Sequence, residues 1–218
     1  MISPNMATML GFICTDAKLD SGGWQKMLSA AVEQSFNKIT VDGDTSTNDC
    51  VLGLANSASG VMLEEDAQDF QAALTELCQE LAYLIVQDAE GGTKVLHIAI
   101  EGAKNNIEAE MACRTIAHSP LVKTALFGQD PNWGRIVAAL GRSGANFAPE
   151  DVSVKLAGIT IFENGVPVDL DLDSLLCPYL KRKDIHILLT LGQGEGRYSM
   201  LASDLTYDYV RLNAAYRS

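Results

Sequence analysis

The first apolar run of the chain, Met9–Cys14, follows a turn-forming stretch. The turn is Ser3-Pro4-Asn5, in which proline fixes φ and the asparagine side chain can bond its own backbone. The run is too short to span a membrane, and it is apolar at both odd and even positions. That pattern is typical of a strand buried on both faces. We therefore predict a buried strand here, with Thr8 at its entrance.

Helical and extended patterns alternate along the rest of the chain. Apolar residues recur at helical spacing in segments 24–39, 70–85 and 107–118. Continuous or alternating apolar segments predict strands at 50–55, 95–100, 152–156, 159–162 and 185–191. Pro120 is expected to stop a helix, with a short strand at Leu121–Phe127 behind it. A further helix is predicted with Asp130 as its N-cap and Pro131 at its first position. The chain is thus predicted to be a mixed α/β protein.

The helical and extended patterns are interrupted at Glu101–Asn106, where we place a domain boundary. The expected domains are residues 1–103, the half that contains Thr8, and residues 104–218, a C-terminal α/β domain. The tail after Leu205 has large apolar residues at alternating positions, so we expect it to be held in place rather than frayed.

Composition excludes several classes of partner. The 218 residues carry a formal net charge of −12 and no basic cluster, which argues against nucleic acid or an anionic membrane. No stretch approaches the ~20 apolar residues of a membrane helix, and the first residues do not resemble a secretory signal. The 5 cysteines are widely spaced, with no Cys-x-x-Cys pair, which favours a reducing compartment and hence the cytoplasm.

A metal site is not expected either. Asp42, Asp44 and Ser46 alternate like the start of an EF-hand calcium loop. However, the glycine falls at the second place of the loop instead of the sixth, and the twelfth place is Gly53 rather than glutamate. The 3 histidines are scattered along the chain. We interpret residues 41–49 as a turn-rich loop whose polar side chains bond local backbone.

Thr8 has two interpretations. As a β-branched residue before a strand, it could simply favour extended backbone. A cut between Ala7 and Thr8 would instead free an α-amino group with a pKa near ~7.7–8.0, beside a hydroxyl that needs a base to become a nucleophile. One residue would then supply both nucleophile and base.

Five sequence motifs in order resemble the glutamate N-acetyltransferase (ornithine acetyltransferase) family of arginine biosynthesis. They lie at residues 4–10 (Pro-Asn-Met-Ala-Thr-Met-Leu), 43–49, 90–94, 130–135 and 208–218. Together they make the chain similar, over nearly its whole length, to the β chain of that family. The resemblance implies a layered sandwich of sheets and helices, as in the DmpA and ornithine acetyltransferase-like fold, plus a smaller C-terminal α/β domain.

The resemblance also implies an activity and its residues. The precursor would cleave itself between Ala7 and Thr8, and Thr8 would carry an acetyl group from N-acetylornithine to glutamate. Glu90, Asn213 and Ser218 would contact the substrate, and the carboxylate of Glu90 suits its ammonium group. The loop at residues 43–49 would lie near the active site. No cofactor is expected, although acetyl-CoA is an acetyl donor for some family members.

The family's upstream α chain has no counterpart in these residues. In the family, that half supplies the Thr-Gly pair of the oxyanion hole and a lysine of the pocket, so we expect this chain to need it, in an α2β2 assembly. Two other functions remain open: an N-terminal-nucleophile aminopeptidase, which the set Glu90, Asn213 and Ser218 disfavours, and a non-catalytic regulatory or truncated half-protein.

Overall fold

The structure, a computed structural model, describes residues 1–3, 9–45, 48–64 and 67–215. It divides into two units, Met1–Ile85 and Val86–Ser218. This division differs from the expected boundary after residue 103. That boundary would cut the chain at the end of strand β4 (Val95–Ala103), which pairs along its length with two strands from the C-terminal part of the chain. Because the hydrogen bonds of β4 go to those strands, it belongs with the second unit.

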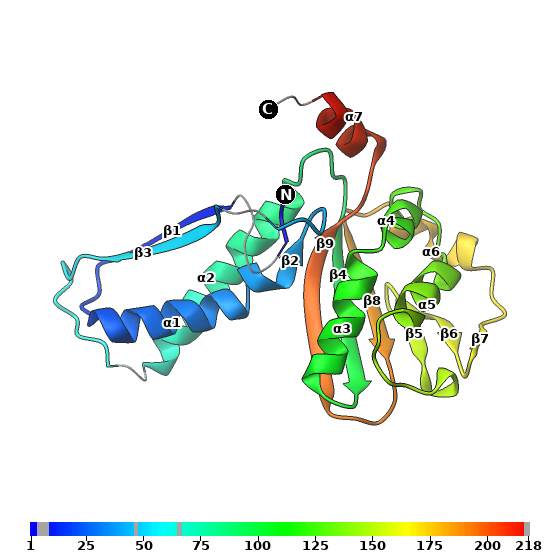
Figure 1. Cartoon of the computed structure of the whole chain (residues 1–218), viewed down its shortest axis with the longest axis horizontal. Helices are drawn as coiled ribbons and strands as arrows, with labels where there is room; N and C mark the ends of the chain where they lie inside the picture. The colour runs from blue at the N-terminus through cyan, green and yellow to red at the C-terminus, as the bar shows by residue number, and fades with distance from the viewer. Residues whose placement is uncertain (4–8, 46–47, 65–66, 216–218) are drawn as a thin grey trace. The chain divides into compact units, whose positions relative to one another are not determined.

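The first unit contains two long helices and a pair of parallel strands (Figure 1). Its elements are β1 (Leu10–Thr15), α1 (Ser21–Glu33), a 3-10 turn (Phe36–Lys38), β2 (Ile39–Thr40), β3 (Cys50–Ala55) and α2 (Gln68–Gln87), whose last residues lie in the second unit. Asp20 caps α1 by accepting hydrogen bonds from the backbone N–H groups of Gly22 and Gly23.

The inner face of the β1–β3 pair lies against α1. β1 pairs with β3 in parallel, with Leu10 opposite Cys50 and Ile13 opposite Gly53. A Cβ atom on Gly53 would lie 2.5 Å from Cζ2 of the Trp24 indole on α1, so only glycine lets this ring reach the strand. Ile13 is buried on the same face.

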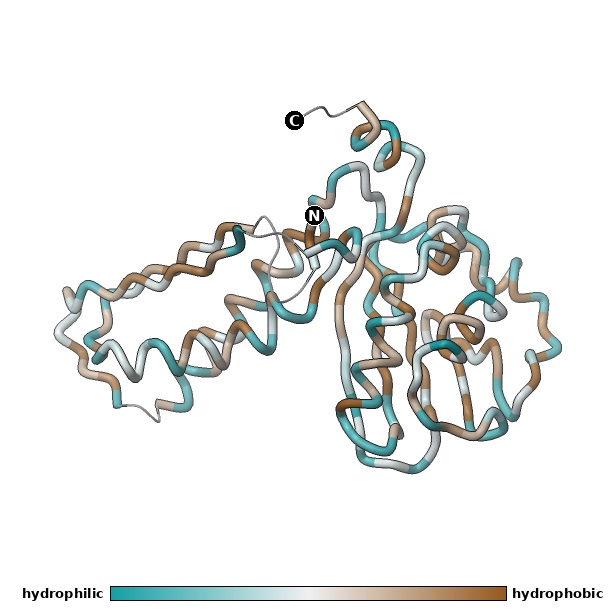
Figure 2. Tube along the Cα trace, in the orientation of Figure 1, coloured by the Kyte–Doolittle hydropathy of each residue, from teal (hydrophilic) through white to brown (hydrophobic). Residues whose placement is uncertain are grey.

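The outer face of the same pair is apolar and exposed, which corrects the prediction of a strand buried on both faces. It carries Leu10 (66% exposed), Phe12 (61%), Leu52 (46%) and Leu54 (58%), and the apolar positions are visible along both strands in Figure 2. The apolar run does form a strand, but the described residues of its unit cover only one side.

The second unit is a mixed sheet with helices on one face. Its strands follow in the order β9-β4-β8-β5-β6-β7, with β8 parallel to β4 and β9 antiparallel to it. The remaining elements are α3 (Asn106–Ala117), α4 (Pro120–Phe127), α5 (Trp133–Gly141), a 3-10 turn (Pro149–Asp151), β5 (Ser153–Leu156), β6 (Ile159–Glu163), β7 (Val166–Pro167), α6 (Leu172–Leu180), β8 (Asp184–Thr190), β9 (Gly196–Ser203) and α7 (Tyr207–Ala215).

The core of the second unit lies between that sheet and the helices α3 to α6. Alternate residues of β4, including Leu96, Ile98 and Ile100, point into it, and Ile116 of α3 is fully buried among them. The opposite face of the sheet carries His97 and His186, which are register partners on β4 and β8. Their rings stack with centroids 4.3 Å apart, and Nε2 of His97 lies 2.8 Å from Oδ1 of Asp184.

Two local predictions in this unit are wrong. Leu121–Phe127 is helical, because Ser119 caps α4 by accepting from the N–H of Val122 and Pro120 occupies the first turn. The next helix is capped by Asn132, not Asp130, and begins at Trp133. The overall class is confirmed: the chain is a mixed α/β protein.

Candidate functional site

Ala7 and Thr8, the predicted cleavage site, lie outside the described residues, and so does Ser218. The structure does describe the residues on either side of the 4–8 segment. On the downstream side, the N–H of Met9 donates to Oδ1 of Asp49 at 2.5 Å, and the N–H of Cys50 donates to the carbonyl of Met9 at 2.9 Å. Both polar backbone groups of Met9 are therefore bonded to Asp49 and Cys50, the residue before β3 and its first residue.

The upstream side is held by the beginning of the same loop. The N–H of Ile2 donates to Oδ1 of Asp42 at 2.9 Å, and the N–H of Val41 donates to the carbonyl of Ile2 at 2.7 Å. The hydroxyl of Thr40 donates to that carbonyl as well, at 3.2 Å. Two aspartates seven positions apart, Asp42 and Asp49, thus hold the backbone before and after the segment that contains the predicted scissile bond.

The two carboxylates differ electrostatically. Burial raises the pKa of Asp49, and the hydrogen bond from Met9 only partly offsets it. Burial also acts to raise the pKa of Asp42. There, however, hydrogen bonds from the N–H of Ile2 and from other donors outweigh it, and the pKa lies below its ordinary value. The sequence predicted that the polar side chains of this loop bond local backbone, and it did not indicate that these two carboxylates bond backbone 40 positions upstream.

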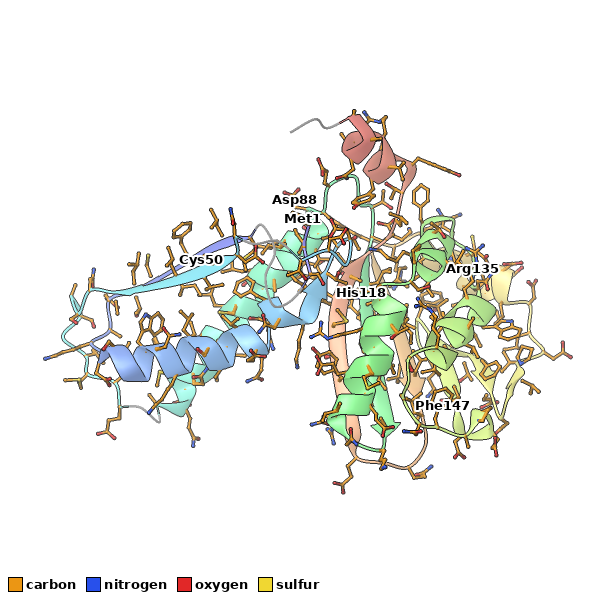
Figure 3. All side chains as sticks on the ribbon, viewed as in Figure 1. Met1, Cys50, Asp88, His118, Arg135 and Phe147 are labelled. Atoms are coloured by element: carbon orange, nitrogen blue, oxygen red, sulfur yellow. The ribbon has the colours of Figure 1, made fainter. Side chains whose placement is uncertain are left out.

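A cavity of about 350 Å³ opens beside these residues within the first unit. Ser3, Met9 and Asp49 contribute to its wall, together with Cys50, labelled in Figure 3, and residues of α1 that include Glu33. Its lining mixes carboxylate, hydroxyl and apolar groups. The cavity is large enough for a small polar molecule.

In the second unit, two of the predicted substrate residues lie together. Nδ2 of Asn213 on α7 donates to Oε2 of Glu90 at 3.5 Å, although 123 positions separate them in the chain. The same Nδ2 donates to the carbonyl of Tyr209 at 3.0 Å. Glu90 and Asn213 are both exposed, so the carboxylate and the amide are free to meet a ligand from solvent. Such a pair can accept from an ammonium group and donate to a carboxylate.

The loop that carries Glu90 is anchored at its far end by buried groups. Asp204 is buried and accepts hydrogen bonds from the N–H and the hydroxyl of Thr93 and from the N–H of Lys94. Nζ of Lys94 donates to the carbonyl of Leu180, the last residue of α6, at 2.8 Å. Burial lowers the pKa of Lys94, and the nearby Asp204 opposes that shift.

The motif at residues 130–135 has a structural role in this chain. Asn132 accepts from the N–H of Arg135 at 3.0 Å to cap α5, and its Nδ2 donates to Asp130 at 2.9 Å. Arg135, labelled in Figure 3, donates from Nη1 to the carbonyl of Leu121 at 3.0 Å and so joins α5 to α4. These bonds fix the packing of two helices.

Neither a metal cluster nor a membrane span is found in the part of the chain that the structure describes. No three His, Cys, Asp or Glu side chains converge there in a way that could hold a metal ion. Within those same residues, no helix is long and apolar enough to cross a membrane.

Comparison with known proteins identifies the family. The model of the ArgJ family matches residues 1–218. The chain belongs to the ArgJ family. It is 55% identical over 219 residues to the arginine biosynthesis bifunctional protein ArgJ of Nitratidesulfovibrio vulgaris, covering 100% of this chain and 56% of that protein. It is 45% identical over 222 residues to the ArgJ protein of Bacillus subtilis, covering 100% of this chain and 54% of that one.

The chain thus spans about half the length of the curated relatives it matches. A solved structure has the same extent: the crystal structure of ArgJ from Bacillus halodurans superposes with a TM-score of 0.90 at 40% identity, covering 96% of this chain and 100% of that one. This match confirms the expected fold. It also shows that a chain of ArgJ in a crystal has nearly the limits of the present one.

Proposed function

We propose that this chain is the β-chain half of a glutamate N-acetyltransferase of arginine biosynthesis, and that it moves an acetyl group from N-acetylornithine to glutamate. The observation that carries the proposal is the match to the ArgJ family over residues 1–218, where relatives are named arginine biosynthesis bifunctional proteins. The 3.5 Å contact between Glu90 and Asn213 supports it, because a carboxylate and an amide suit an amino-acid substrate.

The proposed reaction runs through Thr8. The hydroxyl of Thr8 attacks the carbonyl of Ala7, so the acyl group moves from the nitrogen to the oxygen of Thr8 and the α-amino group is freed. Water then hydrolyses this ester, which releases Ala7 as a carboxylate and restores the Thr8 hydroxyl. The freed amine takes the hydroxyl proton as the oxygen attacks the acetyl carbonyl of N-acetylornithine. Ornithine leaves with the proton, and Thr8 keeps the acetyl group as an ester. The amine of glutamate then attacks the ester, forms N-acetylglutamate and restores the Thr8 hydroxyl. The step needs no cofactor, and acetyl-CoA is the alternative acetyl donor to test.

The upstream half of the precursor is the proposed partner. The relatives are nearly twice as long as the aligned region, so a second segment of similar size exists in them. The outer face of β1 and β3, with Leu10, Phe12, Leu52 and Leu54 exposed, is an apolar surface of the kind that interfaces cover. We propose that the upstream half covers it and that two such pairs assemble as α2β2. We place the enzyme in the cytoplasm, in keeping with cysteines that form no disulfide among the described residues.

The test is mass spectrometry of the complete precursor, made with its upstream half, before and after addition of N-acetylornithine. The expected result is a cut before Thr8 and, on the new N-terminal residue, an added acetyl group that glutamate removes. A precursor that stays whole and takes up no acetyl group would overturn the proposal. An acetyl group that water removes as fast as glutamate does would point to a hydrolase instead.

A further inference from the structure

The helix that carries Asn213 has few contacts that could place it. No residue of α7 is buried, and Tyr207 and Val210 are largely exposed. A helix normally takes its position from a buried apolar face. With so little of it buried, α7 is placed by its first turn, by the polar bonds that join it to neighbouring segments and by an edge-to-face contact of Tyr207 with Phe127 of α4, whose ring centroids are 5.5 Å apart.

Thr206 forms the main bonds of that first turn. Its side chain is buried, and its hydroxyl oxygen accepts from the N–H of Tyr209 at 3.0 Å, which is the bond of an N-cap residue. The hydroxyl proton goes the other way, to the carbonyl of Gly91 at 2.5 Å. One hydroxyl therefore joins the start of α7 to the residue that follows Glu90.

Gly91 lets the two segments approach closely. Its φ is +69°, in the left-handed region that favours glycine. A Cβ atom there would lie 2.5 Å from the backbone nitrogen of Tyr209 and 2.8 Å from the carbonyl carbon of Asp208. The backbone of the Glu90 loop is thus in direct contact with the first turn of α7. The bonds from Thr93 to Asp204 hold the same two segments together one step further along.

We infer that Thr206 is a positioning residue for the substrate site: its hydroxyl fixes the first turn of α7 on Gly91, and through that turn it sets the separation of Asn213 from Glu90. The inference rests on the function proposed above, in which Glu90 and Asn213 contact the amino-acid substrate. Asn213 lies nearly two helical turns beyond Thr206, so a small tilt of α7 at its start moves the amide away from the carboxylate.

The test compares three variants of the complete two-part enzyme. Thr206→Val keeps the shape of the side chain and removes the hydroxyl, whereas Thr206→Ser keeps the hydroxyl. Thr115→Val is the matched control, because the Thr115 hydroxyl donates to the carbonyl of Met111 within its own helix α3, at 2.7 Å. Steady-state acetyl transfer gives KM for N-acetylornithine and kcat separately. Hydrogen exchange of the Tyr209 amide, measured on the present chain, reports the first turn of α7 without any need for activity.

For Thr206→Val we expect KM for N-acetylornithine to rise about tenfold, because the loss of a helix cap changes an equilibrium constant by about that factor. We expect kcat to change less than about twofold. The cut before Thr8 should stay complete, and the Tyr209 amide should exchange faster. Thr206→Ser should restore both KM and exchange, and Thr115→Val should change neither. If Thr206→Val does not fold, Gly91→Ala disturbs the same contact from the other side and should also raise KM.

An unchanged KM in Thr206→Val and Gly91→Ala, or unchanged exchange of the Tyr209 amide, would overturn the inference. So would a fall in kcat and thermal stability at constant KM, since that is what a merely structural role predicts. Failure of the proposed function looks different: the unaltered two-part enzyme would then transfer no acetyl group. In that case the inference fails as a statement about substrate, and the exchange data still decide whether the hydroxyl holds α7.

Discussion

Phe12 offers the sharpest test of the proposed partner surface. It lies on the outer face of β1 and is 61% exposed in this chain. We expect Phe12→Ala to weaken binding of the upstream half more than it weakens the chain itself. The comparison is made with the two halves produced as separate chains, by titration calorimetry for their association and by denaturant unfolding for the stability of this chain alone.

The magnitudes follow from the exposed fraction. Full burial of a phenylalanine side chain stabilises by about 1.5–3 kcal/mol. About two fifths of Phe12 is already covered, so Phe12→Ala should lower the free energy of unfolding of the isolated chain by roughly 0.6–1.2 kcal/mol. The remaining three fifths, about 0.9–1.8 kcal/mol, is available to the interface, which corresponds to a Kd raised roughly 5- to 20-fold.

Val166→Ala is the matched control. Val166 on β7 is 58% exposed, close to the exposure of Phe12, but it lies on the edge hairpin of the second unit. It should leave the Kd of the upstream half unchanged. If Phe12→Ala and Val166→Ala had the same effect on Kd, the outer face of β1 would not be the interface, and the argument from apolar exposure would be refuted.

Three further predictions concern the chemistry and the sheet. In the complete precursor, Thr8→Ala should abolish both the cut and acetyl transfer, while Thr8→Ser should keep part of each but react more slowly, because it loses the methyl group that restricts χ1. Mass spectrometry measures the cut and a transfer assay measures the activity, and normal transfer by Thr8→Ala would exclude Thr8 as the acetyl carrier. Glu90→Gln should raise KM for ornithine-type substrates more than it slows the cut before Thr8, because it removes a charge-assisted contact with the substrate ammonium group that contributes ~1.5–3 kcal/mol. Loss of the cut at constant KM would assign Glu90 to maturation instead. Burial and the neighbouring His97 lower the pKa of His186 below its ordinary value, and Asp184 opposes that shift only in part. The unfolded state therefore binds the proton more readily, so the free energy of unfolding should fall as pH drops below about 6.5. His186→Gln should reduce that fall in urea unfolding between about pH 7.5 and about pH 5, and an unchanged slope would show that other groups cause it.

The sequence predicted most elements because their apolar spacing is strong. The strand at 50–55 is β3, and the helix expected at 107–118 is α3 to within a residue. Leu121–Phe127 was ambiguous, because a short apolar run has no clear period. Ser119 and Pro120 together make the start of a helix, whereas Pro120 taken alone looks like a stop. The face of β1 that stays exposed could not be predicted, since a run of apolar residues does not say which chain covers it.

The residues of the candidate site, like the elements of the fold, could be predicted from the sequence only in part. Glu90 and Asn213 were assigned to the substrate by family resemblance, and no spacing rule connects two residues 123 positions apart. The contacts that place them left weaker signals. A threonine just before a helix, with an acidic residue in the first helical turn, is typical of a helix start, and Thr206 and Asp208 form this pattern. A Gly-Gly pair is typical of a close approach of two backbone segments. These signals became informative only once Gly91 and Tyr209 were known to touch.

Each unit of this chain presents a feature that its own residues leave incomplete. In the first unit, the outer face of β1 and β3 exposes large apolar side chains, and β1 begins two positions after Thr8 in the sequence. In the second, α7 has no buried residue, yet it carries an amide aligned with Glu90. Exposed apolar surface costs free energy in water and persists where a partner covers it. The relatives, nearly twice as long, contain a segment of the right size to be that partner. Under the proposed function, the upstream half is expected to cover the outer face of β1 and β3, next in sequence to the proposed nucleophile.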